Sequence, residues 1–349
     1  MAIGSEWPEN AARKEKISSQ TSSFSNQKRN FARAKWAERD HPYASRKNRK
    51  KVNRNLLGHL TIAGACVIWG LMAPFGKDAM NQGITGIDMV TFRVTGSMLC
   101  FWLLSWLTGN HEATTWHDRL LYAGAGLFGV VTNQCCFTIG LSITSPTNAS
   151  IMTTTMPIIT LLLTALVLHE RITWCKLLGV ALGITGALIL ITGSKAAADS
   201  RQGDLRGDLL VIGAQCSFAL YLTLFKRLIG RHNVVTNMKW MMLWAVILAC
   251  PFTAPHLAQL PWADVPARAW GETAFVVFMG TFVAYILMMY AQKTLRPTVV
   301  AMYNYVQPIV SCLVSVAAGL AIFGLPQAAA CVMIFTGVWL VTKKLKVKN

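Results

Sequence analysis

The chain has 349 residues, of which 53% are hydrophobic and only 14% are charged. A soluble protein of this length needs more charged surface, because its exterior faces water. Uncharged apolar runs of about 20 residues are long enough to cross the hydrocarbon core of a bilayer, and the runs here lack the two-residue alternation of a membrane β-barrel. The composition therefore excludes a soluble protein and predicts an all-α membrane protein with several spans.

The net charge of +18 is concentrated at the two ends of the chain. Residues 1–55 hold fourteen Lys and Arg against five Asp and Glu, and residues 343–349 add four lysines. We interpret 1–55 as a disordered basic N-terminal extension, because it has few aliphatic residues, and 343–349 as a basic cytoplasmic tail. Basic ends of this kind stay in the cytoplasm and contact anionic lipid. Nucleic acid is not an expected partner.

Ten apolar segments follow the extension in chain order. We predict transmembrane helices at 57–77, 87–108, 119–141, 146–168, 174–194, 208–228, 235–255, 270–291, 297–322 and 325–342. An even number of spans returns the C-terminus to the side of the N-terminus. Because both ends and the loops on their side are basic, we expect a multi-pass protein of the cell inner membrane with both termini cytoplasmic.

Two stretches of the chain share a frame. The first is SPTNASIMTTTMP, residues 145–157, and the second is RPTVVAMYNYVQP, residues 296–308. Both contain Pro-Thr and then a proline ten residues after the threonine, and the two frames are 151 residues apart. The same offset relates Gly129 to Gly280. The frame is therefore part of a longer internal repeat.

Near the first predicted helix the offset between the two copies is 149, which relates Gly58 to Gly207. The repeat divides the chain into two five-helix halves, 56–194 and 207–342. Because five is odd, the second half crosses the membrane in the opposite direction to the first. Inverted repeats of this kind are typical of secondary transporters.

The extension has no counterpart in the second copy of the repeat. Val52 stands six residues before Gly58, and a Val codon can start translation in bacteria. We expect translation to begin near Val52, so that residues 1–51 are either not part of the natural protein or dispensable.

Three stretches carry a resemblance to a known family. They are GACVIWGLMAPFGK in the first predicted helix, SPTNASIMTTTMPIITLLLTALVLHERITWCKLLGVALGITGALILITG across the fourth and fifth, and the weaker copy RPTVVAMYNYVQPIVSCLVSVAAG in the ninth. On these residues the chain resembles the EamA family of the drug/metabolite transporter superfamily over about 57–342. The resemblance implies a secondary transporter, often an exporter, of small polar metabolites such as amino acids or related compounds. It also implies alternating access between the two inverted halves.

Arg93 is the strongly basic residue set inside a predicted span. A charge at the centre of a membrane helix costs about 2.5–3.5 kcal/mol on insertion scales. Two interpretations stay open. Arg93 anchors a carboxylate or phosphate of the substrate, or it extends toward the membrane surface and pairs with an acid such as Asp88.

Polar and aromatic side chains within other spans are further candidates. Tyr303, Asn304 and Gln307 share one face of the ninth predicted helix, and Trp69 and Asn133 lie in the first and third. An unpaired amide in lipid is costly, so these side chains either line a substrate cavity or bind neighbouring helices. The residues that we predict to bind the substrate are Arg93, Asn304, Gln307, Tyr303, Trp69 and Asn133.

Other motifs limit the chemistry of the chain. All fifteen Asp and Glu residues lie in tails, loops or helix ends, which argues against a carboxylate proton relay inside the membrane. The nine cysteines form no CxxC or Cys/His cluster, so we interpret them as small buried hydrophobes and expect neither metal nor cofactor. Gly179 and Gly183 form a GxxxG step, which we interpret as helix packing.

An integral-membrane enzyme acting on a lipid-linked substrate is the alternative function. It would need acids or histidines clustered at one membrane face, and His59, His169 and Glu170 come nearest to such a cluster. Because these residues are sparse, we favour a transporter rather than an enzyme. The expected partners are a small-molecule substrate and the lipid bilayer, and the sequence leaves a homodimer open.

Overall fold

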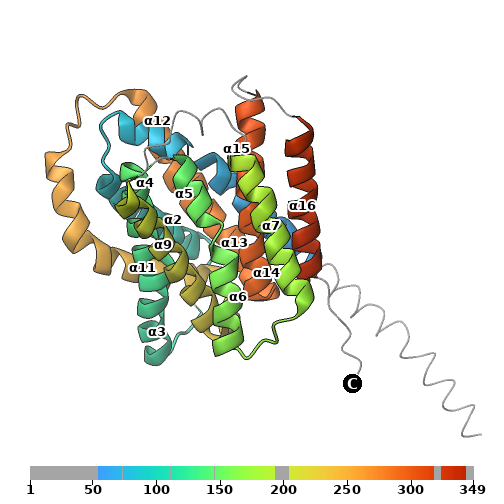
Figure 1. Ribbon diagram of the computed structural model, residues 1–349. Coiled ribbons are helices and arrows are strands. Elements are labelled where there is room, and N and C mark those ends of the chain that lie inside the picture. The colour runs from blue at the N-terminus through green and yellow to red at the C-terminus, as the bar shows by residue number, and fades with distance from the viewer. Residues whose placement is uncertain are drawn as a thin grey trace, which may run out of the picture. The chain divides into compact units, whose positions relative to one another are not determined.

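The computed structural model of the protein describes residues 54–72, 74–110, 112–144, 146–192, 204–317 and 324–342. Every regular element within these ranges is a helix (Figure 1). The chain divides into a short unit, Met1–Leu56, and a compact unit, Leu57–Asn349, and the fold below is that of the second. The predictions for 1–51, for translation from Val52 and for the tail after Thr342 fall outside the described residues.

The first half begins with a helix at Arg54–Asn81 and ends with α7. Its other elements are α2 (Gly86–Leu107), α3 (Trp116–Gly126), the π-helix η1 (Leu127–Val131), α4 (Thr132–Ile143), α5 (Pro146–Thr153), α6 (Met156–Val167) and α7 itself (Trp174–Thr192). Elements α3, η1 and α4 form one continuous span, Trp116–Ile143.

The second half repeats this order. Its elements are α9 (Leu205–Leu224), α10 (Lys226–Arg231), α11 (Val234–Thr253), the 3-10 helix η2 (Ala254–Gln259), α12 (Ala267–Val277), the π-helix η3 (Phe278–Val283), α13 (Ala284–Thr294), α14 (Pro297–Met302), the 3-10 turn η4 (Tyr303–Tyr305), α15 (Val306–Ala317) and α16 (Leu325–Thr342). Elements α12, η3 and α13 form the span Ala267–Thr294, as α3, η1 and α4 do in the first half.

The predicted spans agree with these helices to within a few residues. Nine helices of the described ranges are long and apolar enough to cross a membrane. The segment predicted as the ninth span, 297–322, is helical over Pro297–Ala317 but is interrupted at η4, and it is not among these nine. The all-α membrane architecture is therefore confirmed, whereas the number of ten spans stays a prediction.

Capping side chains set where several helices begin. At α2, the hydroxyl of Thr85 accepts the backbone N–H of Asp88, and the Asp88 carboxylate accepts the backbone N–H of Thr85. This reciprocal pair satisfies two N–H groups that an unprotected helix start leaves without partners. Asn233 caps α11 in a simpler way, by accepting the backbone N–H of Thr236 at 2.7 Å. Local sequence thus fixes the starts of these equivalent helices.

The fifth helices of the two halves, α7 and α16, pack side by side (Figure 1). A Cβ atom at Gly337 would lie 2.5 Å from the carbonyl oxygen of Gly179, and one at Gly186 would lie 2.7 Å from the carbonyl oxygen of Ala330. These two contacts are equivalent, because 151 residues separate Gly179 from Ala330 and Gly186 from Gly337. The small residues let the two backbones touch, as the GxxxG step predicts.

A second reciprocal pair of contacts lies at the π-helices. A Cβ atom at Gly129 would meet the ring of Tyr221 at 2.7 Å, and one at Gly280 would meet the thioether of Met72. Gly129 and Gly280 are 151 residues apart, and Met72 and Tyr221 are 149 apart. An operation that carries each half onto the other in this reciprocal way is a two-fold rotation. With five spans in each repeat, as the sequence predicts, such a rotation would invert one half relative to the other.

Candidate functional site

The two stretches that share the Pro-Thr frame are interrupted helices. In the first half α5 ends at Thr153 and α6 begins at Met156, next to Pro157. In the second half α14 ends at Met302, and the turn η4 leads into α15, which contains Pro308. A proline lacks the N–H that would continue the helix. The shared frame therefore produces a broken helix in each half, the kind of element that forms binding sites in transporters with inverted repeats.

Each half also carries its π-helix at an equivalent position, η1 around Gly129 and η3 around Gly280. The indole N–H of Trp69 donates to the carbonyl oxygen of Gly280 at 2.9 Å, and the hydroxyl of Tyr285 donates to that of Gly129 at 3.2 Å. Single-turn π segments occur frequently at functional sites. Here they bring polar side chains of the other half against the backbone.

Two pairs of equivalent residues touch each other. Trp69 and Phe218 are 149 residues apart and pack edge to face, with ring centroids separated by 6.3 Å. Gln134 and Tyr285 are 151 residues apart, and the amide of Gln134 donates to the hydroxyl of Tyr285 at 3.4 Å. Residues exchanged by a two-fold rotation can touch only beside the rotation axis. Both pairs therefore mark the axis between the halves.

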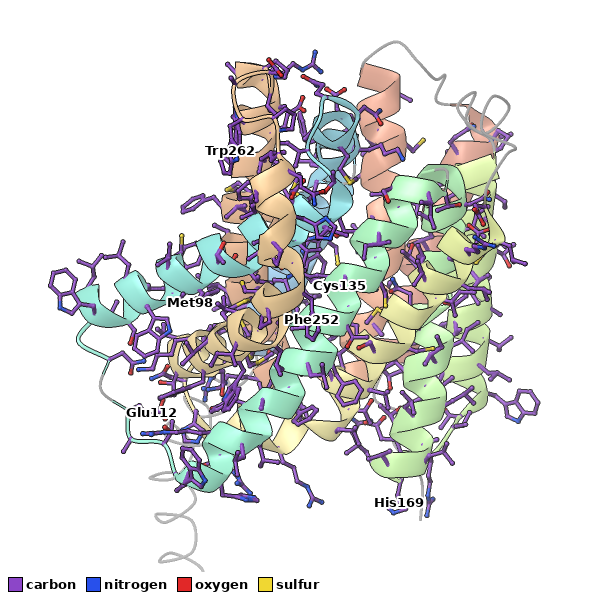
Figure 2. The ribbon with its side chains drawn as sticks, turned by 90° about the vertical axis from the view of Figure 1, so that its left-hand side faces the viewer. Met98, Glu112, Cys135, His169, Phe252 and Trp262 are labelled. Atoms are coloured by element: carbon purple, nitrogen blue, oxygen red, sulfur yellow. The ribbon has the colours of Figure 1, made fainter. Side chains whose placement is uncertain are left out.

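Arg93 lies beside this axis. Its side chain is buried, with 5% of the residue exposed. The guanidinium Nε donates to the hydroxyl of Thr281 on η3 at 3.0 Å, and the group lies close to Tyr285 and Cys135. Figure 2 shows Cys135 in the middle of the helices, away from both ends. The charge of Arg93 is thus placed deep in the molecule, where the two halves meet.

Arg93 is not paired with Asp88. The Asp88 carboxylate accepts both the N–H and the hydroxyl of Thr85, the latter at 2.6 Å. Among the described residues, the ion pairs within 4.0 Å do not include Arg93. Of the two interpretations of Arg93, the structure does not support a pair with Asp88, and the role of anion anchor stays a prediction.

Tyr303, Asn304 and Gln307 lie together around η4, as their spacing predicts. The amide of Gln307 donates to the Asn304 side-chain oxygen at 3.1 Å, and the amide of Asn304 contacts the sulfur of Met156 on α6. The hydroxyl of Tyr303 is hydrogen-bonded to Nδ1 of His59 at 2.9 Å. These side chains join the broken helix of the second half to the first helix and to the broken helix of the first half.

Trp69 and Asn133 also bond across the halves. The amide of Asn133 donates to the carbonyl oxygen of Ala214 at 3.0 Å. The ring of Trp69 packs against Tyr285, with centroids 6.1 Å apart, and so joins the group around Arg93. Among the described contacts none joins Arg93 directly to the residues around η4. The six predicted residues therefore form neighbouring groups rather than one cluster.

Two residues at the axis were not among the predicted binding residues, Gln134 and Tyr285. Both lie mid-span, and the offset of 151 that relates them was already visible in the sequence. Thr281 was also missed, because a threonine in an apolar span is too common to single out. Its position next to Arg93 depends on the π-helix η3, which no sequence pattern predicted.

Contacts between charged and polar side chains join the two halves at both ends of the molecule. At one end Arg268 pairs with Asp78 at 2.6 Å. At the other, the two ring nitrogens of His232 lie 3.3 Å from a Glu112 oxygen and 3.2 Å from an Asp118 oxygen. Figure 2 places Glu112 and His169 at the same end and Trp262 at the opposite one, as alternating spans require.

The Glu112 carboxylate is held in its charged form. Burial raises its pKa, but the backbone N–H of Asn233, 2.9 Å away, and the ring of His232 bind the carboxylate, and the pKa lies below its ordinary value. Hydrogen bonds to the ionised form produce a shift in this direction. The side chains of His232 and Glu112 thus link the two halves at this end through a carboxylate that carries its charge.

Two equivalent lysines cover helix ends. Lys77 donates to the carbonyl oxygen of Leu141 at 2.8 Å near the end of α4, and Lys226, 149 residues later, donates to that of Leu295 at 2.6 Å at the end of α13. Burial lowers the pKa of Lys226 to about 8. A cation at a helix C-terminus satisfies carbonyl groups that have no partner within the helix.

The residues that would support an enzyme do not gather. His59 is bound to Tyr303, Glu170 pairs with Lys176 at 2.8 Å, and His169 follows the end of α6 with a backbone φ of 51°. Within the described ranges, no group of three or more His, Cys, Asp or Glu side chains is placed to hold a metal ion.

The family of the chain follows from its two repeats. The profile described as the EamA-like transporter family matches residues 56–192 and again residues 205–343. The chain belongs to the EamA-like transporter family. This membership makes it a multi-pass membrane transporter and confirms the resemblance that the sequence shows.

Curated relatives and a solved structure agree with this assignment. The uncharacterized transporter YyaM of Bacillus subtilis (strain 168) is 22% identical over 62% of this chain and 71% of its own length. The uncharacterized transporter YetK of the same organism is 20% identical over 78% of this chain and 83% of its own. A solved crystal structure with 17% sequence identity covers 84% of this chain and 98% of its own, with a TM-score of 0.64. At that identity the structure supports the fold alone.

Proposed function

We propose that this transporter is a secondary carrier that exports small polar metabolites, such as amino acids, by alternating access between its two inverted halves. The observation that carries the proposal is the contact of equivalent residues, Trp69 with Phe218 and Gln134 with Tyr285. Polar side chains at a two-fold axis deep in the membrane are positioned to be reached from either side as the halves rock.

The ion pairs at the two ends support alternating access. Arg268 with Asp78 and His232 with Glu112 each link one half to the other. Opening toward one side would separate the first pair, and opening toward the other side would separate the second. The Arg268–Asp78 pair is exposed, and exposed ion pairs contribute only about 0–1 kcal/mol, so this contact can close a path without locking it.

The proposed binding residues are Arg93, Asn304, Gln307, Tyr303, Trp69 and Asn133. Asn304→Ala and Gln307→Ala should reduce transport in cells and in proteoliposomes while the amount of protein in the membrane stays near normal. Asn81→Ala and Gln259→Ala are matched controls, because both side chains are exposed. Metabolite profiles of an overexpressing strain against a deletion strain name the compounds to assay. If abundance falls in step with transport, the two residues are structural and the site is elsewhere.

The direction of transport and the orientation of the protein in the membrane are part of the same proposal. The basic termini are expected in the cytoplasm of an inner-membrane protein, next to anionic lipid. A reporter fused after Asn349 should be active in its cytoplasmic form only. Periplasmic activity there would remove the even span count and with it the inverted arrangement.

A further inference from the structure

The hydroxyl of Tyr285 decides how the amide beside it is oriented. A carbonyl oxygen can only accept, so the single proton of the hydroxyl points to the Gly129 carbonyl, 3.2 Å away. Gln134 faces the same hydroxyl oxygen at 3.4 Å and must therefore present its NH₂ group. Its carbonyl oxygen, Oε1, then points elsewhere. Gln134 is 1% exposed, and this oxygen has no hydrogen-bond partner.

Two groups with unused binding capacity thus lie next to Tyr285. Arg93 is a buried cation whose hydrogen-bond partner is the neutral hydroxyl of Thr281, and Gln134 Oε1 is a buried acceptor without a donor. A buried polar group without a partner is costly, and a buried charge without one is more costly still. An unpaired donor cation and an unpaired acceptor that both lie near Tyr285 fit a ligand that supplies the missing groups.

We propose that Arg93 and Gln134 form a two-point site for a small carboxylate that also carries an N–H donor. The guanidinium of Arg93 binds the carboxylate by charge-assisted hydrogen bonds, and Gln134 Oε1 accepts the N–H. The inference rests on the proposed transport function and names the substrate class of its central site.

The second half carries no matching charge. Thr85 caps α2 and Asn233 caps the equivalent helix α11, so the position corresponding to Arg93 is Met241. Met241 and its neighbour Met242 are both buried. One cation at a two-fold axis binds one carboxylate and gives the ligand one orientation.

Thermal unfolding of the purified full-length protein in detergent tests the site. The probes are the common amino acids, added one at a time. For the amino acid that raises the unfolding midpoint most, the matched probes are its C-terminal amide, which lacks the carboxylate, and its deaminated acid, which lacks the N–H donor. The variants are Arg93→Gln and Gln134→Met, with Arg206→Gln as the control that removes an exposed cation.

The expected result has three parts. The amino acid should stabilise the wild type and Arg206→Gln more than either analogue does. Arg93→Gln should weaken its apparent binding by roughly 10- to 100-fold, the range for hydrogen bonds to charged groups, and should raise the midpoint of the ligand-free protein because an unpaired charge is removed. In Gln134→Met, the deaminated acid should raise the unfolding midpoint as much as the amino acid does.

Three results would overturn the proposal. The first is a C-terminal amide that raises the unfolding midpoint as much as the amino acid does. The second is an Arg93→Gln variant that binds the amino acid as tightly as the wild type, and the third is an unfolding midpoint that no probe changes. A ligand-free Arg93→Gln protein that is less stable than Arg206→Gln makes Arg93 a structural residue. The transport function is judged separately in proteoliposomes. Binding without transport by the wild type refutes the carrier, whereas equal transport by the wild type and Arg93→Gln refutes only this site.

Discussion

The two halves of the molecule use the same backbone contacts and surround them with different side chains. At the π-helices, Gly129 packs against the rigid ring of Tyr221, and its equivalent Gly280 packs against the flexible thioether of Met72. At the axis, Gln134 of one half faces Tyr285 of the other. The repeat therefore preserves how closely helices approach, whereas the chemistry of each position is free to differ between the halves.

The largest effect is expected where the halves touch through backbone on both sides. A Cβ atom at Gly337 would lie 2.5 Å from the Gly179 carbonyl oxygen, and neither backbone can move without separating α7 from α16. Gly337→Ala should therefore destabilise the protein by about 2–3 kcal/mol, the upper part of the range for overpacked cores. The measurement is the free energy of unfolding in detergent by denaturant titration.

Gly271→Ala and Gly213→Ala are the controls for this comparison. A Cβ atom at either position would meet nothing within 4 Å. Both substitutions should be neutral or stabilising by up to about 1 kcal/mol, because alanine is the better helix former. Equal stability of Gly337→Ala and Gly271→Ala would contradict the close packing of the fifth helices.

The next largest effect is a difference in stability cost between equivalent substitutions at the two π-helices. Gly129→Ala should cost about 1–3 kcal/mol, because a packed aromatic ring next to the backbone cannot yield. Gly280→Ala should cost less than about 1 kcal/mol, because the end of a methionine side chain can change rotamer. In a Tyr221→Met background, compared with Tyr221→Met alone, the cost of Gly129→Ala should fall toward that of Gly280→Ala. An unchanged cost in that background would mean that the ring does not set the difference.

The order and length of the helices were readable in the sequence because apolar length and charge control them. The segments with ends marked by charged or capping residues, such as α2 after Thr85, were predicted within one or two residues. The interruptions were not predicted. The sequence showed Pro157 and Pro308, but a proline only permits a break, and whether the helix bends or stops depends on packing against the other half.

The candidate site was predicted in part for a similar reason. Mid-span polarity singled out Arg93 and the residues around Asn304, since polar groups in lipid are costly. It could not say that Gln134 and Tyr285 would meet, because that contact depends on where the two-fold axis passes. The offset of 151 residues shows that Gln134 and Tyr285 are equivalent positions of the repeat, and only a comparison of the two copies reveals this.

The smallest effect concerns the equivalent lysines at the helix ends. Lys226→Met should cost about 1–2 kcal/mol and Lys77→Met about 0.5–1 kcal/mol, because each substitution leaves a carbonyl oxygen at a helix end without its hydrogen-bond donor. The second acceptor of Lys77, the Ser142 carbonyl, lies at 3.2 Å in an exposed position, so water can replace the lysine there. The free energy of unfolding in detergent again gives both values.

The effect of pH sharpens this last comparison for Lys226. Burial lowers its pKa to about 8 in the folded protein, below the ordinary 10.5. Between pH 8 and pH 10.5 the unfolded chain therefore binds more protons at this group than the folded protein does. The stability that Lys226 contributes rises with pH across this range, and it is lost as the pH falls through 8. The neutral amine still donates to the Leu295 carbonyl, so the difference between wild type and Lys226→Met should widen from pH 7 to pH 10. A difference that stays constant or narrows would show that Lys226 is well hydrated, and that its pairing with the end of α13 does not bury the charge.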